Sequence, residues 1–259
     1  MHKQVIIDCF PESAAKYRHG YAVVVVDVIR ATTSAITVAA GGGRCIPAAS
    51  IAVALELKGK LKGSLLAGEI GGEIAPGFEL NNSPADLASR DVTGRPVILL
   101  SSSGTRLICQ AQGADAIYLA CFRNYGSVAH HLDGLVPQVA VIGAGSRGEF
   151  REEDQMCCAW IARDFVEMGY APANQTTLNL IKQWATESPE AAQHSKSADY
   201  LKRSGQTRDL DFILTHINDL RDTYEMRGSE VVSVPAYENG LALNASSVIN
   251  LAPEPKTAC

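Results

Sequence analysis

Short runs of apolar, often β-branched residues recur along the chain between longer stretches with helical spacing. The short runs predict strands at 4–7, 22–27, 44–47, 64–67, 96–101, 116–119, 138–142 and 231–235. The longer stretches predict helices at 32–40, 51–60, 105–112, 125–132 and 152–168. Several strands, such as the valine run at 23–26, show no alternation with polar residues, which is typical of strands covered on both faces. The pattern therefore predicts a layered α/β fold with helices above and below a mostly parallel sheet.

The pattern changes after residue 172, because residues 174–227 are polar, rich in charge and helical in spacing. Ser188, Pro189 and Glu190 form a typical helix start, and 209–221 gathers its apolar residues on one face. We interpret 174–227 as a helical cover or insertion that packs on the sheet, with a cap over a binding site as the alternative. Since a strand returns near 231, we expect residues 1–259 to form a single α/β domain that ends in a loose tail, PEPKTAC.

Composition narrows the class of protein. The 259 residues carry 23 Lys+Arg against 28 Asp+Glu, a net charge of −5, which disfavours nucleic acid as a partner. The longest apolar run, 21–26, is too short for a bilayer, and the N-terminus lacks the features of a signal peptide. Seven cysteines without a C-x-x-C spacing indicate reduced thiols. We therefore expect a cytoplasmic protein with no membrane partner.

Ligands of open α/β sheets bind at the carboxyl ends of strands, so the polar residues after each apolar run matter most. Asp27 follows the valine run, where a carboxylate needs a cation or hydrogen-bond donors. Arg30 suits a phosphate or carboxylate, and Thr32 and Thr33 can cap the next helix or contact an anion. The alternative is an internal Asp27–Arg30 ion pair with ordinary capping.

Two further segments also place polar residues directly after a predicted strand. The loop 68–84 is rich in glycine and acids and contains Glu69 and Asn82, a composition that can hold a hard divalent cation or simply form a long surface loop. The segment 100–106 passes from a buried strand through small residues into a helix, which predicts a nest of N–H groups for an anion or routine helix capping.

A fourth segment, 141–154, contains a formal G-x-G-x-x-G match at Gly143, Gly145 and Gly148. We reject a dinucleotide site, because Arg147 and several acids occupy the place of the pyrophosphate and the helix begins too late. Arg147 as an anion ligand with a nearby acid as metal ligand is the better interpretation. The acids at 152–154 can also be explained by favourable charge at a helix N-terminus.

Together the four segments offer arginines and N–H groups for an anion and carboxylates for a cation. This combination suits a small phosphorylated substrate that is bound with Mg²⁺ and hydrolysed. The P-loop pattern and Gly-x-Ser-x-Gly are both absent, which argues against an NTPase and a serine hydrolase.

The series DVIRATTS, GEIGGEIAPGFELNNSP, SSSGTR and GSRGEFREED resembles the 2-phosphosulfolactate phosphatase family in order and spacing. The resemblance implies a three-layer α/β/α fold, a dimer or larger homo-oligomer, and a Mg²⁺-dependent phosphatase. Its reaction would release phosphate from 2-phosphosulfolactate to give sulfolactate, a step of coenzyme M biosynthesis. The sequence departs from the family at Ile70, where arginine is usual, and at Ser103, where asparagine is usual.

Residue assignments follow from the motifs and the resemblance together. We expect the catalytic residues to be Asp27, Glu69, Arg30 and Arg147. We expect the substrate-binding residues to be Thr32, Thr33, Asn82, Ser102, Ser103, Gly104 and Thr105. We expect the metal ligands to come from Asp27, Glu69, Glu153 and Asp154. The alternative, motivated by Ile70 and Ser103, is a catalytically inactive or repurposed family member that binds a small anionic ligand.

Overall fold

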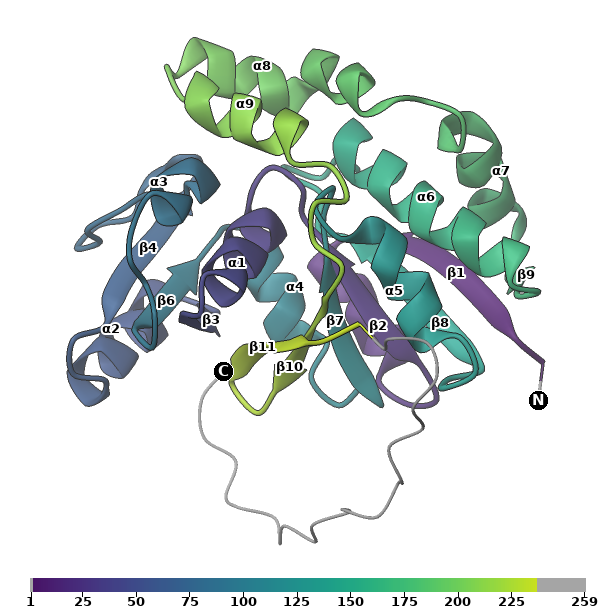
Figure 1. Ribbon diagram of the computed structural model, residues 1–259, viewed down its shortest axis with the longest axis horizontal. Coiled ribbons are helices and arrows are strands. Elements are labelled where there is room, and N and C mark those ends of the chain that lie inside the picture. The colour runs from purple at the N-terminus through teal and green to yellow at the C-terminus, as the bar shows by residue number, and fades with distance from the viewer. Residues whose placement is uncertain (1, 237–259) are drawn as a thin grey trace, which may run out of the picture.

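The computed structural model describes residues 2–236, so the predicted tail PEPKTAC lies outside the described residues (Figure 1). The strands in chain order are β1 (Gln4–Cys9), β2 (Ala22–Val26), β3 (Arg44–Ala48), β4 (Leu65–Ile70), β5 (Glu73–Ile74), β6 (Pro96–Leu100), β7 (Ala116–Ala120), β8 (Gln138–Gly143), β9 (Ala171–Pro172), β10 (Thr223–Arg227) and β11 (Glu230–Val234). They form one mixed sheet in the order β5-β4-β6-β3-β11-β10-β7-β2-β8-β1-β9. Every strand predicted from the sequence is present.

The helices in chain order are η1 (Pro11–Tyr17, a 3-10 helix), α1 (Ala31–Ala40), α2 (Ile51–Lys60), α3 (Pro84–Ala88), α4 (Gly104–Gln110), α5 (Tyr125–Leu132), α6 (Glu152–Glu167), α7 (Gln175–Trp184), η2 (Pro189–His194, also 3-10), α8 (Lys196–Arg203) and α9 (Thr207–Thr215). The five helices predicted before residue 170 correspond to α1, α2, α4, α5 and α6. Only their ends differ, by one or two residues.

Two groups of parallel strands make up most of the sheet. One group is β9-β1-β8-β2-β7 and the other is β3-β6-β4. The hairpin of β10 and β11 lies between them and pairs antiparallel with β7 on one side and β3 on the other. The last described strands of the chain thus join the two halves of the sheet.

The valine run of β2 explains why the sheet has helices on both faces. Val24 and Val26 belong to a core with α5, α6 and α7, whereas Val23 and Val25 belong to a core with η1, α1 and α4. All of these valines are fully buried. Alternate side chains of one strand therefore enter different cores, and the fold is a three-layer α/β/α sandwich, as expected.

The helical segment predicted at 174–227 is real but shorter than predicted. It comprises α7, η2, α8 and α9, and in Figure 1 α8 and α9 lie across the top of the molecule above α1. The helix predicted at 209–221 is wrong in its second half, because α9 ends at Thr215 and β10 follows at 223. Asn218 adopts a left-handed φ of 48° and donates its N–H to Phe122 O at 2.8 Å, which pulls the chain out of helical geometry.

The six cysteines within the described residues are free, as expected, and Cys259 lies outside them. Among residues 2–236, no helix is both long enough and apolar enough to cross a bilayer.

Candidate active site

A cavity of about 980 Å³ lies where strand ends from both halves of the sheet meet the underside of α8. Its wall includes eight of the residues expected from the sequence: Asp27, Arg30, Glu69, Asn82, Ser102, Ser103, Arg147 and Asp154. Five expected residues are absent from the wall: Thr32, Thr33, Gly104, Thr105 and Glu153. The structure thus brings together all four motifs, but not every residue in them.

Asp27 sits at the end of β2 and is only 8% exposed. Its Oδ1 accepts a hydrogen bond from the Ala31 N–H at 3.2 Å, at the start of α1. Within residues 2–236 no hydrogen bond reaches Oδ2. Burial, with the negative charges of Glu69 and Glu153, raises the pKa of Asp27 to about 7, against the opposing effects of the Ala31 N–H and Arg30. The carboxyl group is held in place by one hydrogen bond, and no basic side chain among residues 2–236 is bound to it.

Asp154 joins two of the loops around the cavity from the first turn of α6. Its Oδ1 accepts from Val28 N–H at 2.9 Å and its Oδ2 from Gly145 N–H at 3.2 Å. It is buried, and burial, with the charges of Asp27 and Glu153, raises its pKa well above the usual value for aspartate. The bonds are made to backbone outside its own helix, so Asp154 does more than complement the dipole of α6.

Glu153, by contrast, does not line the cavity, and it is buried, with 1% of its surface exposed. Burial raises its pKa, while hydrogen bonding with Ser197 and Ser195 opposes the rise. Its Oε2 has no hydrogen-bond partner among residues 2–236. The expected metal role of Glu153 is therefore less favoured by its position than that of Asp154.

Glu69, at the end of β4, is occupied by its own loops. Its Oε2 accepts from Gly72 N–H at 2.7 Å and from Ser102 Oγ at 3.0 Å, and its Oε1 accepts from Ser102 N–H at 2.6 Å. The carboxylate therefore fastens the loop after β4 to the turn after β6. It lines the cavity from that position.

The turn before α4 offers fewer free N–H groups than the sequence suggested. Ser101 Oγ accepts from Gly104 N–H at 2.9 Å and from Thr105 N–H at 3.2 Å, and the Ser102 N–H is bound to Glu69. The capping alternative thus describes most of this turn. Ser102 and Ser103 still line the cavity.

The two threonines at the start of α1 likewise have structural partners. Thr32 Oγ1 lies 2.7 Å from Ala120 O and 2.8 Å from Asp27 O, and Thr33 Oγ1 donates to Val28 O at 2.7 Å. Both side chains are buried below the cavity floor. They shape the turn that carries Asp27 and do not reach the cavity.

Asn82, unlike the two threonines, has a side-chain atom without a hydrogen-bond partner among residues 2–236. It is 3% exposed and lines the cavity, yet its Oδ1 has no hydrogen-bond partner within the described residues. A buried acceptor without a partner is costly, so this oxygen is a candidate contact for a cation or for a ligand that donates a hydrogen bond.

Arg147 stands in the loop after β8 with a left-handed φ of 52°, a conformation that arginine rarely adopts. Its side chain is exposed and lines the cavity, and within residues 2–236 no acceptor or carboxylate contacts it. A strained backbone that directs an unpaired guanidinium at a cavity is typical of a functional site.

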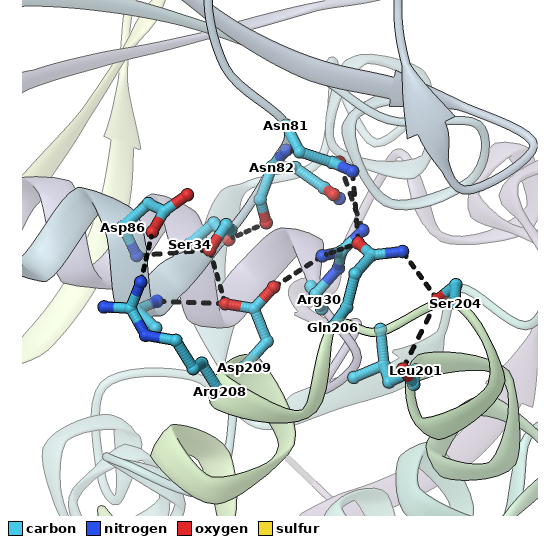
Figure 2. Close-up of polar contacts among 12 residues, drawn as sticks. Arg30, Ser34, Asn81, Asn82, Asp86, Leu201, Ser204, Gln206, Arg208 and Asp209 are labelled. Atoms are coloured by element: carbon cyan, nitrogen blue, oxygen red, sulfur yellow. Dashed lines mark hydrogen bonds and ion pairs between the residues drawn. The ribbon is translucent and has the colours of Figure 1, made fainter.

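Arg30 is bound instead to the helical cover (Figure 2). Its Nη1 donates to Asp209 Oδ2 and to Gln206 Oε1, each at 2.6 Å, and its Nη2 donates to Asn81 Oδ1 at 3.1 Å. From the sequence, Arg30 was expected to contact either the substrate or Asp27. Its pairing with Asp209, 179 residues away along the chain, was not expected.

The cover also contributes residues that the sequence analysis missed. Lys196, Tyr200 and Arg203 of α8 line the cavity. Lys196 Nζ pairs with Glu149 Oε2 at 2.8 Å, and Tyr200 Oη contacts Glu73 Oε1 at 3.2 Å. The alternative in which 174–227 caps a binding site therefore fits the geometry better than a helical packing element alone.

These features define an α/β protein whose ligand cavity, at the ends of its strands, combines buried carboxylates with an unpaired arginine. The chain belongs to the 2-phosphosulfolactate phosphatase family, since the family model described as 2-phosphosulpholactate phosphatase matches residues 9–220. That range contains all four motifs and the cover.

Individual proteins with the same description also match this chain. A probable 2-phosphosulfolactate phosphatase of Clostridium perfringens is 30% identical over 226 residues, which are 83% of this chain and 90% of that protein. Those of Carboxydothermus hydrogenoformans and Symbiobacterium thermophilum are 39% and 36% identical over 146 and 147 residues, or 56% and 55% of this chain. These two matches span 60% and 62% of the relatives' own length.

Proposed function

We propose that this protein is a phosphatase that hydrolyses a small phosphate ester related to 2-phosphosulfolactate, and that it uses Mg²⁺. The family membership supports the reaction class, and the cavity supports a small anionic substrate. Hydrolysis of a phosphate monoester depends mainly on holding the phosphoryl group and neutralising the charge that develops on its oxygens.

The proposal rests on one observation, which is that acidic and basic side chains line the same cavity. Within residues 2–236 no basic side chain is bound to the buried carboxyl groups of Asp27 and Asp154, and Arg147 adds a guanidinium without an acidic partner. Burial raises the pKa of both carboxyl groups, so a bound cation would favour their ionised forms beside a phosphoryl group. The same cavity therefore favours a divalent cation and a phosphoryl group together.

The residues present fit Mg²⁺. Among residues 2–236 no three acidic, histidine or cysteine side chains form a ready-made metal site. Magnesium ions, however, are often held by one or two carboxylates, with water and substrate oxygens completing the shell. The Oδ2 of Asp27, which accepts no hydrogen bond from residues 2–236, and the carboxylate of Asp154 are the best candidates. When bound, Mg²⁺ supplies charge neutralisation for the phosphoryl oxygens.

The side chains of this protein then have distinct tasks. Arg147 binds phosphoryl oxygens through its planar fork. The buried amide of Asn82 offers the substrate a polar contact, and Ser103 lines the wall. Ile70 is 48% exposed and does not line the wall, although its neighbours Glu69 and Gly71 do.

The test is phosphate release from a panel of small esters, including 2-phosphosulfolactate, with Mg²⁺ and with EDTA. We expect metal-dependent turnover of 2-phosphosulfolactate or a close analogue. Phosphate binding without turnover of any ester would instead favour the inactive, anion-binding alternative. Turnover that is unchanged in EDTA would refute the proposed role of Mg²⁺.

Two expectations from the sequence, a cytoplasmic location and assembly into a dimer or larger homo-oligomer, remain predictions. Light scattering of the purified protein tests the second.

A further inference from the structure

Arg30 and Asp209 form an ion pair in the interior of the molecule. Their side chains are 4% and 5% exposed, and Arg30 Nη1 lies 2.6 Å from Asp209 Oδ2. An arginine keeps its charge even when buried. A guanidinium in this position therefore needs the carboxylate, because removing one partner of a buried pair leaves an uncompensated charge.

The second oxygen of Asp209 binds a different part of the chain. Asp209 Oδ1 accepts from Ser83 Oγ and from Ala85 N–H, at 3.1 Å for the latter, at the start of α3. One side chain of α9 thus ties the cover to the start of α1 and to the start of α3. The other ion pairs between the cover and the sheet side of the cavity, Arg208–Asp86 and Lys196–Glu149, are exposed and contribute little.

Arg30 also contacts the segment that forms part of the cavity wall. Its Nη2 donates to Asn81 Oδ1, which also accepts from Asn82 N–H at 2.8 Å. Ser34 Oγ of α1 donates to Asn82 O at 2.6 Å. The backbone of Asn82, whose buried side-chain oxygen has no partner among residues 2–236, is therefore held from both sides.

We infer that Asp209 is a positioning residue of this site. It fixes Arg30 and, through it, the Asn81–Asn82 segment, and it neutralises Arg30. Anion binding is then left to Arg147 and Arg203, which line the cavity and have no acidic partner among residues 2–236. Gln206 assists, since its Oε1 accepts from Arg30 Nη1 at 2.6 Å and from Asn81 Nδ2 at 3.1 Å. The inference rests on the proposed function for its effect on turnover, but not for its effect on anion binding.

Asp209→Asn separates the two roles. The new amide can still accept from Ser83 and Ala85, but its NH₂ group faces the N–H donors of Arg30. Arg30 then keeps its charge without a counter-charge and is free to bind an anion. We expect kcat to fall by about ten- to hundredfold because the wall loses its alignment. We also expect inorganic phosphate to bind several-fold more tightly, because the cavity gains an unpaired cation.

The matched control is Asp211→Asn, which removes the same charge from the exposed side of the same helix. It should leave turnover and phosphate affinity close to those of the unmodified protein. Gln206→Ala is the second variant, for use if Asp209→Asn does not fold. It removes neutral contacts only, so we expect kcat to fall several-fold with phosphate affinity unchanged.

The measurements are kcat and KM, titration calorimetry with inorganic phosphate, and thermal unfolding of each variant. Opposite changes in turnover and phosphate affinity for Asp209→Asn support the inference, since loss of structure alone would weaken both. Equal or weaker phosphate binding by a folded Asp209→Asn overturns it, as does unchanged kcat in Gln206→Ala. If the unmodified protein hydrolyses no ester, the proposed function fails alone, because the phosphate titrations still decide the inference.

Discussion

Gly104 lies so close to Asp27 that a Cβ atom placed on it would be 2.3 Å from Asp27 Oδ2 and 2.5 Å from Ala31 Cβ. The glycine at the start of α4 is therefore required by the carboxylate of β2, which belongs to another motif. Gly104 was expected to bind substrate. Its position indicates that it serves the site by leaving room for Asp27.

Gly104→Ala should push Asp27 out of place. We expect the free energy of unfolding to fall by about 1–3 kcal/mol, as for other overpacked sites, and turnover to fall by at least about tenfold. The control is Gly59→Ala in α2, where no heavy atom lies within 4 Å of the new Cβ and where alanine should stabilise the helix by up to about 1 kcal/mol. Chemical denaturation and phosphate release measure both effects. Full activity in Gly104→Ala would contradict the steric argument.

Asp27→Asn should abolish turnover and leave the fold intact, because the asparagine oxygen can still accept the Ala31 N–H while the charge is lost. Phosphate release and thermal unfolding are the two measurements. Asp115→Asn, on an exposed residue just before β7, is the matched control. A folded Asp27→Asn protein that retains turnover would refute the catalytic role of Asp27.

The buried acids also predict a dependence of stability on pH. The pKa of Asp27 is raised to about 7 and that of Asp154 is raised as well, both chiefly by burial. Between about pH 4 and pH 7 the folded protein therefore holds protons that the unfolded chain has released, so the free energy of unfolding falls as pH rises through this range. In EDTA we expect a lower thermal midpoint at pH 8 than at pH 5. Asp27→Asn should reduce the difference, and a midpoint that rises with pH would show that other groups dominate.

Arg147→Gly should separate stability from function. Glycine adopts the left-handed φ of 52° without strain, so the protein should become more stable by about 1 kcal/mol. The loss of the guanidinium should weaken phosphate binding by about tenfold or more. Arg90→Gln is the control, because Arg90 is also exposed but does not line the cavity. Calorimetry with phosphate distinguishes the two arginines, and equal losses would contradict the assignment.

The fold was predictable where one strand faces two cores. Val23 to Val26 lack alternation because neighbouring valines enter different cores, and the sequence shows this directly. The strand at 223–227 was not predictable in the same way, because Glu225 and Arg227 make it look polar. The helix before it ends through contacts of Asn218 and Leu220 with the backbone at 122–123, which only the tertiary structure supplies.

The site was predictable in its motifs and less so in the role of each residue. Asp27 follows from an acid placed beside a strand end, and Asp154 from the acids at a helix start and the resemblance to the family, but nothing local shows that Thr32 and Thr33 bond to backbone carbonyls. Asp209 had a detectable signal, since it lies four residues before the buried Ile213 of α9. An acid on the buried face of a helix needs a partner. Identifying that partner as Arg30 requires the fold.

The hairpin of β10 and β11 has a consequence for how the protein is made. The strands that carry Asp27 and Arg147 lie on one side of it, and those that carry Glu69 and Ser102 lie on the other. Chains leave the ribosome N-terminus first, so residues 223–234 arrive after every wall of the cavity has been synthesised. We expect the nascent chain to carry two unjoined half-sheets with exposed strand edges. Chaperones would bind the chain in that state. A chain that stops before residue 223 would be prone to aggregate and would not form a smaller enzyme.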